Sequence, residues 1–292
     1  MATAFAVFCA DDGSLTFYKR DTVPTAGEEF EGKVASNVYE GFETESYSSA
    51  SAVPWYNERT SILSVSFVDE IAPEYTQCWF RGASSIISFD AANLNTSNIT
   101  NMRYMFTGCS SLTTLDLSSF DTSNVTNMRS MFSECSGLTT LDVTNFNTSK
   151  VTDMMHMFSE CSSLTTLDVT NFNTNNVTNM QSMFSECNKI TTIYVSERWS
   201  TTAVTSSIFM FYNCTSLAGD IPYDPNYTDA TYATYIGGYL TNRALFDYLI
   251  KGGTLMDLAD QIRVLSATSD SMNPIQMSEV LSNIRDAKEV AF

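Results

Sequence analysis

Cysteine recurs along this chain at a nearly constant interval. Cys109, Cys135, Cys161 and Cys187 lie 26 residues apart, and Cys214 follows after 27. The best copy of the repeat reads NVTNMRSMFSECSGLTTLDVTNF, from residue 124 to residue 146. One unit of this length cannot bury its apolar side chains alone, so the copies must stack against one another. The interval therefore predicts a short solenoid of five to six copies over residues 74–221.

The spacing of the apolar residues changes within each copy. In the first half, the apolar residues have the spacing of one face of a short helix; they are Val125, Met128, Met131, Phe132 and Cys135. Thr126 or Asn127 could cap the start of this helix. The second half has the L-x-x-L-x-L spacing of a leucine-rich repeat strand, at Leu138, Leu141 and Val143. The expected fold class is therefore an α/β solenoid, a leucine-rich repeat with a 26-residue period.

The two ends of the chain differ from the repeats. Residues 1–73 alternate apolar and polar side chains around an Asp12-Gly13 turn, which predicts a β-rich N-terminal cap domain. Residues 222–240 form a Tyr-rich linker, and residues 241–292 are expected to form a small helical C-terminal module. Its three helices would span residues 242–251 and begin again after caps at Thr254 and Asn273.

Two sequence patterns carry a family resemblance. The pattern N-M-x-x-M-F-x-x-C-x-x-L-T-T-L-D, held by several copies, resembles the BspA-type leucine-rich repeat surface proteins of gut and oral bacteria. That resemblance implies a surface-displayed binding solenoid, often involved in adhesion, and no catalysis.

The second pattern, LMDLADQIRVLSATSDSMNPIQMSEVLSNI, resembles a C-terminal module of tail-fibre and tail-associated proteins from phages and prophages of Gram-positive gut bacteria. The positions that match the module are Asp257, Leu258, Ala259, Asp260, Ile262, Arg263, Met272, Pro274 and Met277. One position differs, since Asn273 stands where that module usually has Thr.

The second resemblance implies a protein of the virion tail that is assembled in the bacterial cytoplasm. Its partners would be other tail proteins, and a homo-oligomer such as a trimer would suit a fibre. The apolar stretch from Ala4 to Ala10 has no basic residue before it, so no Sec signal is expected in this sequence. The alternative is a bacterial cell-surface adhesin whose signal is missing from the sequence.

Charge and hydropathy exclude some classes of partner. The sequence has 15 Lys and Arg against 33 Asp and Glu, which gives a formal net charge of −18. Because nucleic-acid binding needs a basic face, we expect no nucleic-acid partner. No apolar run approaches the roughly 20 residues of a membrane-spanning helix, so we expect no membrane insertion.

The sequence offers no catalytic constellation, and we expect neither an enzyme nor a cofactor. His156 is the only histidine, and other copies have Tyr104, Ser130 and Ser182 in its slot. The recurring cysteines are interpreted as buried free thiols. A metal ladder is the alternative, but one ligand per 26 residues does not match a zinc site. A glycan-degrading enzyme is the weakest alternative, since no specific pair of carboxylates is indicated.

One outward-facing pattern remains as a candidate site. Residues between the strand leucines alternate onto the solvent face, so the stacked copies should form an acidic strip. We use this name for Asp90, Thr114, Asp116, Thr140, Asp142, Thr166, Asp168, Thr192 and Tyr194. Either each Asp bonds local hydroxyls and backbone, or the acidic strip binds a host-surface glycan or protein with Tyr194 as its aromatic anchor. Both interpretations stay open at this point.

Overall fold

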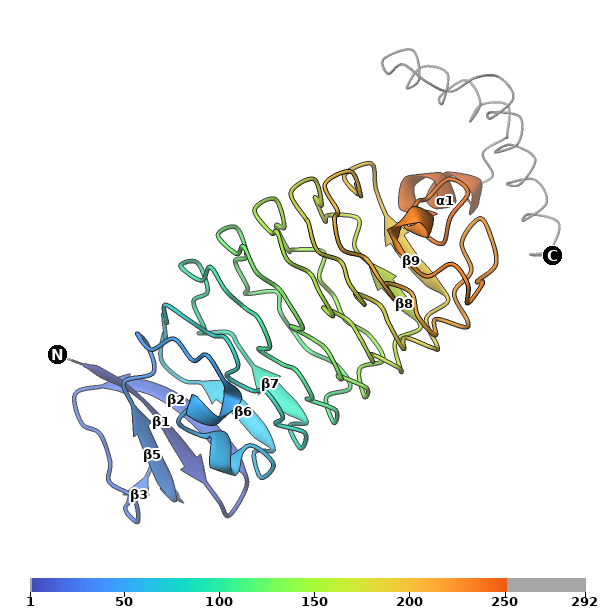
Figure 1. The fold of residues 1–292 in the computed structure, drawn as a ribbon. Helices are drawn as coiled ribbons and strands as arrows, with labels where there is room; N and C mark the ends of the chain where they lie inside the picture. The colour runs from blue at the N-terminus through green and yellow to red at the C-terminus, as the bar shows by residue number, and fades with distance from the viewer. Residues whose placement is uncertain (1, 251–292) are drawn as a thin grey trace.

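The computed structural model describes residues 2–250 and shows a sheet that leads into a row of stacked coils. The chain begins in the N-terminal sheet, winds through successive coils of the repeat and reaches helix α1 at the other end (Figure 1). One apolar core runs through the stack, from Ala4 in the first strand to Leu240 beyond the last repeat. The predicted solenoid is therefore confirmed.

The N-terminal sheet has the order β5-β1-β2-β6-β7. Its antiparallel centre consists of β1 (Thr3–Cys9) and β2 (Ser14–Arg20), and β5 (Asn37–Glu40) pairs antiparallel with the other edge of β1. β6 (Ser64–Phe67) runs parallel to β2, and β7 (Ser88–Asp90), the strand of the first repeat copy, runs parallel to β6. The alternating pattern of the N-terminal region therefore forms strands, and its sheet continues into the solenoid.

The turn between the first two strands depends on glycine. Gly13 has φ 66°, a left-handed conformation that side chains with a Cβ disfavour. A Cβ at this position would also come within 2.6 Å of Leu63 Cγ. Residues 21–63, whose pattern predicts no particular element, contain two short kinds of structure besides β5. The strands β3 (Glu29–Phe30) and β4 (Lys33–Val34) form a two-stranded hairpin, and the 3-10 turns η1 (Ala50–Ala52) and η2 (Tyr56–Glu58) follow β5.

Equivalent side chains of the repeats form columns inside the stack. The five repeat cysteines are fully buried free thiols. Each thiol points at the carbonyl oxygen of a Phe in the preceding coil, at 2.9 to 3.3 Å. The Phe rings also stack from coil to coil, with centroids 5.6 to 5.9 Å apart from Phe80 to Phe211. This alignment confirms the register set by the 26-residue interval.

The predicted short helix in each copy is wrong. No helix occurs within residues 74–221; the chain makes consecutive turns there, with φ 53° at Ser130 and 61° at Glu134. Phe132 N donates to Met157 O of the next coil at 3.0 Å, whereas Met131 N closes a tight turn onto Met128 O at 3.2 Å. Asn127 likewise accepts from the nearby Arg129 N at 3.0 Å, as in an Asx turn.

Stacking explains this difference from the expected helix. Successive turns and a short helix both place an apolar residue about every third position, so spacing alone does not separate them. In a solenoid the neighbouring coil supplies backbone acceptors, and alternate N–H groups bond to it instead of to their own segment. The fold is therefore a leucine-rich repeat solenoid of strands and turns, not the α/β solenoid that the spacing indicated.

The strand half of the repeat forms regular β-strands only at the two ends of the stack. Besides β7, it forms β8 (Thr166–Asp168) and β9 (Thr192–Val195), which pair in parallel with Thr166 opposite Thr192. Residues 114–116 and 140–142 of the middle copies are not regular strands. One backbone bond, from Thr139 N to Thr113 O at 3.0 Å, joins those two copies at the start of this edge.

The chain closes the far end of the stack after the last repeat. The turn η3 (Ala230–Tyr232) lies in a segment whose Ala233, Tyr239 and Leu240 are buried in the common core. β10 (Thr241–Asn242) then pairs in parallel with β9 and leads into α1 (Arg243–Ile250). This helix matches the first one expected of the C-terminal module. The other two, after Thr254 and Asn273, lie outside the described residues, so a helical module as a whole has no support here.

Candidate binding surface

The acidic strip lies on the outer face of the strand half of the repeats, as the alternation of side chains predicts. Its first part is exposed to solvent, namely Asp90, Thr114, Asp116, Thr140, Asp142 and Thr166. Its last part is partly buried, namely Asp168, Thr192 and Tyr194. The strip therefore has an open part and a covered part.

Each Asp of the strip makes the same local hydrogen bond. Oδ1 accepts from the backbone N–H two residues further on, at 2.9 Å from Asp116 to Ser118 and from Asp142 to Thr144. The Thr144 hydroxyl also donates to Asp142, at 2.6 Å. These bonds hold the pKa of both carboxyl groups below its ordinary value, although repulsion from Asp116 opposes this at Asp142. The carboxylates therefore stay charged at neutral pH.

The local role of these Asp residues leaves room for a ligand. An ionised carboxylate has about four acceptor positions, and one or two hydrogen bonds fill only part of them. A hollow of 260 Å³ opens between two coils of the strip, lined by Asp90, Asp116, Ser118 and Ser119 together with Phe89, Ala91 and Ala92. Its polar lining consists of carboxylate and hydroxyl oxygens, the groups that hydrogen-bond to sugar hydroxyls or ammonium groups.

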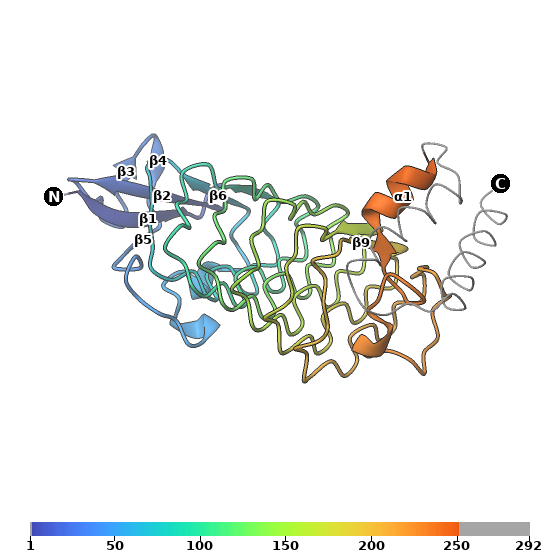
Figure 2. The same cartoon turned by 90° about the horizontal axis from the view of Figure 1, so that it is seen from above.

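Helix α1 covers the other end of the strip. Figure 2 shows α1 beside β9, where Arg243 Nη1 lies 3.3 Å from Asp168 Oδ2. The Arg243 guanidinium also lies over the Tyr194 ring at 4.7 Å, and the Phe246 ring is 5.5 Å from that of Tyr194. Tyr194 is thus engaged by its own chain and does not stand free as the expected anchor.

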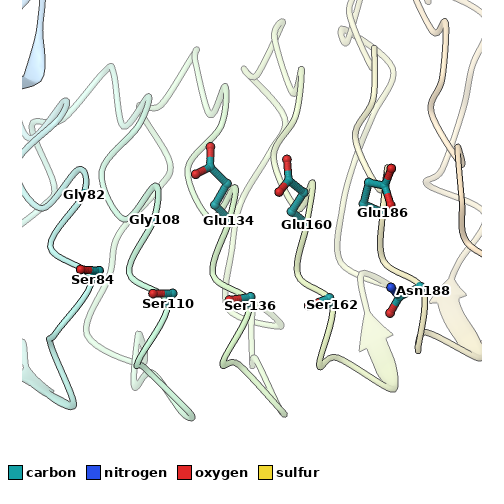
Figure 3. A pocket seen from close by; sticks show the side chains of 10 residues that line it. All are labelled: Gly82, Ser84, Gly108, Ser110, Glu134, Ser136, Glu160, Ser162, Glu186 and Asn188. Carbon is teal, nitrogen blue, oxygen red and sulfur yellow. The ribbon is translucent and has the colours of Figure 1, made fainter.

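A second surface, which the sequence analysis missed, runs along the corner between the turns and the strands. This acidic groove has a volume of 710 Å³ and is lined by Gly82, Ser84, Gly108, Ser110, Glu134, Ser136, Glu160, Ser162, Glu186 and Asn188. In Figure 3 the three Glu side chains of successive coils project side by side, and the Ser side chains form a second row. A signal for it existed in the recurring F-S-E-C motif, because those Glu residues are 26 positions apart.

The Glu residues of the acidic groove influence one another. The pKa of Glu160 is raised, first by partial burial and then by repulsion from Glu134 and Glu186. The negative charge of Glu186 is partly compensated by a hydrogen bond, since Asn213 Nδ2 donates to its Oε2 at 2.6 Å. The groove thus offers acceptors and hydroxyls to a polar or cationic group.

The other residues singled out from the sequence have structural surroundings. His156 is half-buried, and its pKa is lowered by burial and by the nearby charge of Arg129. Burial raises the pKa of Cys135 and of Cys187 to about 12, so these thiols are neutral. Within residues 2–250, no three His, Cys, Asp or Glu side chains come together as a set of metal ligands. No helix in that range has the length and apolar character needed to cross a membrane.

Comparisons with known proteins bear on the repeats. A family described as "Mycoplasma protein of unknown function, DUF285" matches residues 75–196 and 136–236. Among solved structures, the crystal structure of a leucine-rich repeat protein from Bacteroides ovatus ATCC 8483 is similar at 12% identity and a TM-score of 0.28, covering 74% of this chain and 68% of that one. No curated protein matches the sequence.

The family match supports the BspA-type leucine-rich repeat resemblance of the repeat motif. The resemblance to phage tail modules rests on residues outside the described range, and no comparison bears on it. The two matched segments together span residues 75–236, more than half of the 292-residue sequence, and include the Cys and Phe columns. The chain therefore belongs to the DUF285 family of repeat proteins.

Proposed function

We propose that this protein is a non-enzymatic binding protein that recognises a glycan or protein on a cell surface through the open part of the acidic strip. The observation that supports this proposal is the row of exposed carboxylates at Asp90, Asp116 and Asp142. Parallel copies carry them at roughly 4.8 Å intervals, where like charges repel unless something compensates them. A ligand with several hydroxyl or ammonium groups would supply that compensation at successive coils.

We place the binding protein in a phage or prophage tail, with a host-surface glycan or protein and other tail proteins as partners. The C-terminal string that resembles tail-fibre modules motivates this setting, in which the protein would assemble in the bacterial cytoplasm and function as a homo-trimer. A bacterial cell-surface adhesin is the second candidate, and the family match favours it at least as well. Both settings use the same binding surface.

The test of the binding surface is the triple substitution Asp90→Asn, Asp116→Asn and Asp142→Asn. Asn keeps the Oδ1 acceptor of each local turn, so the melting temperature should change by less than about 2 °C. Loss of three charges from one face should weaken binding to a susceptible strain at least tenfold in a panel of gut Gram-positive cells.

The matched control is the triple substitution Glu134→Gln, Glu160→Gln and Glu186→Gln in the acidic groove. It removes the same net charge from a different surface and should leave cell binding within about twofold. Equal loss in both triple variants would mean that overall charge governs binding, and unchanged binding by the strip variant would remove the acidic strip as the binding surface.

A further inference from the structure

Three arginines gather around one tyrosine in the first coils of the solenoid. The guanidinium carbons of Arg81, Arg103 and Arg129 lie 4.5, 5.3 and 6.0 Å from the centroid of the Tyr104 ring. We call this group the arginine cluster. It belongs to the turn half of the repeat, a different segment from the strand half that carries the acidic strip.

The fold itself brings these side chains together. Arg103 and Arg129 occupy the same slot in adjacent copies, 26 residues apart. Arg129 O accepts from Tyr104 N at 2.9 Å, and Arg103 O accepts from Cys78 N at 3.1 Å, so the hydrogen bonds between coils fix their spacing. Tyr104 has φ 61°, the conformation shared by Ser130 and His156 in its slot. The cluster is therefore built on backbone that hydrogen bonds hold to the neighbouring coils.

The arginine cluster is not neutralised within the described part of the chain. None of its three guanidinium groups lies within 4.0 Å of a carboxylate oxygen in residues 2–250, although Arg20 and Arg243 each have such partners there. Arg103 donates to Ser48 O at 3.4 Å, while the buried Nε atoms of Arg103 and Arg129 have no acceptor in that range. Three like charges at one place in a chain of net charge −18 therefore keep most of their hydrogen-bonding capacity.

We propose that the arginine cluster binds an oxyanion, a carboxylate or a phosphate, carried at intervals along an acidic glycan. The planar guanidinium fork donates paired hydrogen bonds to both groups. The Tyr104 ring holds the guanidinium groups through cation–π contacts. Because the Nε atoms of Arg103 and Arg129 are buried, the terminal Nη–H groups are the donors that face the ligand. The oxyanion site follows from the cluster alone, whereas the choice of a glycan polymer as its carrier rests on the proposed binding function.

The charge of the whole protein favours a sparsely charged polymer over nucleic acid. A nucleic acid carries a phosphate at every nucleotide, and the remaining acidic surface would repel most of them. A glycan with one oxyanion only every few sugars could place a single charge at the cluster, while its neutral sugars meet no such repulsion.

The experiment measures binding of the full chain to dextran that carries a carboxymethyl group on one of every few sugars, to dextran phosphorylated to the same extent, and to unmodified dextran. We expect binding to at least one anionic polymer and none to unmodified dextran, with the anionic polymer that binds identifying the oxyanion. The double variant Arg103→Gln/Arg129→Gln should weaken that binding at least tenfold, because it removes two charged groups that donate hydrogen bonds to the oxyanion. Arg81→Gln, an exposed position, should weaken it in the same direction without unfolding the protein.

The control is Lys189→Gln/Arg198→Gln, which removes two exposed cations outside the cluster and should change the affinity by less than about twofold. Equal weakening by this control, or failure of both anionic polymers to bind, would overturn the assignment. The triple Asn variant of the acidic strip should keep its affinity for the anionic polymer. Failure of the strip in the cell-binding test would leave this result unchanged, so the two proposals can fail separately.

Discussion

Leu141→Asp is expected to lower the free energy of unfolding by more than about 4 kcal/mol, enough to disrupt several repeats. The Leu141 side chain is 7% exposed and belongs to the common core. An unpaired carboxylate there would lose its hydration without gaining a partner. Because each coil is stabilised mainly by its neighbours, the damage should spread to adjacent coils. Urea denaturation followed by circular dichroism measures the loss.

Thr140→Asp is the matched control, since it places the same carboxylate one residue earlier. Thr140 is exposed on the acidic strip, so the expected loss is within about 1 kcal/mol, mostly from repulsion by nearby Asp residues. If the two variants were equally stable, the alternation of buried and exposed side chains in the strand half would be wrong.

Phe132→Ala should be the second most damaging change, with a loss of about 3 to 5 kcal/mol. The Phe132 ring is fully buried and stacks between Phe106 at 5.9 Å and Phe158 at 5.8 Å. Its removal leaves a cavity that hydrogen bonds between the flanking coils keep from closing, since Phe132 N and Ser130 N both bond to the next coil. The same denaturation experiment measures this loss.

The chain supplies a control for this substitution in Phe209, which lies in a later copy and is 50% exposed. Phe209→Ala should cost less than about 1 kcal/mol, because its ring loses little buried area. A Phe132→Ala protein as stable as Phe209→Ala would show that the Phe column does not hold the coils together.

The repeat interval was the most informative feature of the sequence. It predicted which side chains share a column, because a solenoid brings residues one period apart into contact whatever the local conformation. It did not separate a helix from successive turns. Which of the two forms depends on the backbone acceptors of the neighbouring coil, as the bond from Phe132 N to Met157 O illustrates.

The candidate sites were predictable only in part. Alternation placed the acidic strip on the outer face, but the cover over Tyr194 comes from Arg243 and Phe246, which are some fifty residues further along the chain. The arginine cluster was missed for a similar reason. Arg81 holds a different slot from Arg103 and Arg129, and only the stacking of three coils brings all three to Tyr104.

Cross-linking of paired cysteines tests the central claim, that the chain winds as coils in register, most directly. In Thr166→Cys/Thr192→Cys the new thiols occupy positions that lie opposite each other in adjacent parallel strands. In Thr140→Cys/Thr192→Cys they stand two coils apart, at about 9.6 Å for the usual strand spacing. The seven native cysteines are buried, and burial raises the pKa of the repeat thiols, so they should not react in the folded protein.

The measurement treats both variants with a thiol-specific cross-linker that has a one-carbon spacer and determines the intact mass of the folded protein. We expect an intramolecular cross-link in Thr166→Cys/Thr192→Cys and unlinked thiols in Thr140→Cys/Thr192→Cys. Equal linking of the two pairs, or linking of the second pair alone, would contradict the stacked-coil fold and with it both proposed binding surfaces.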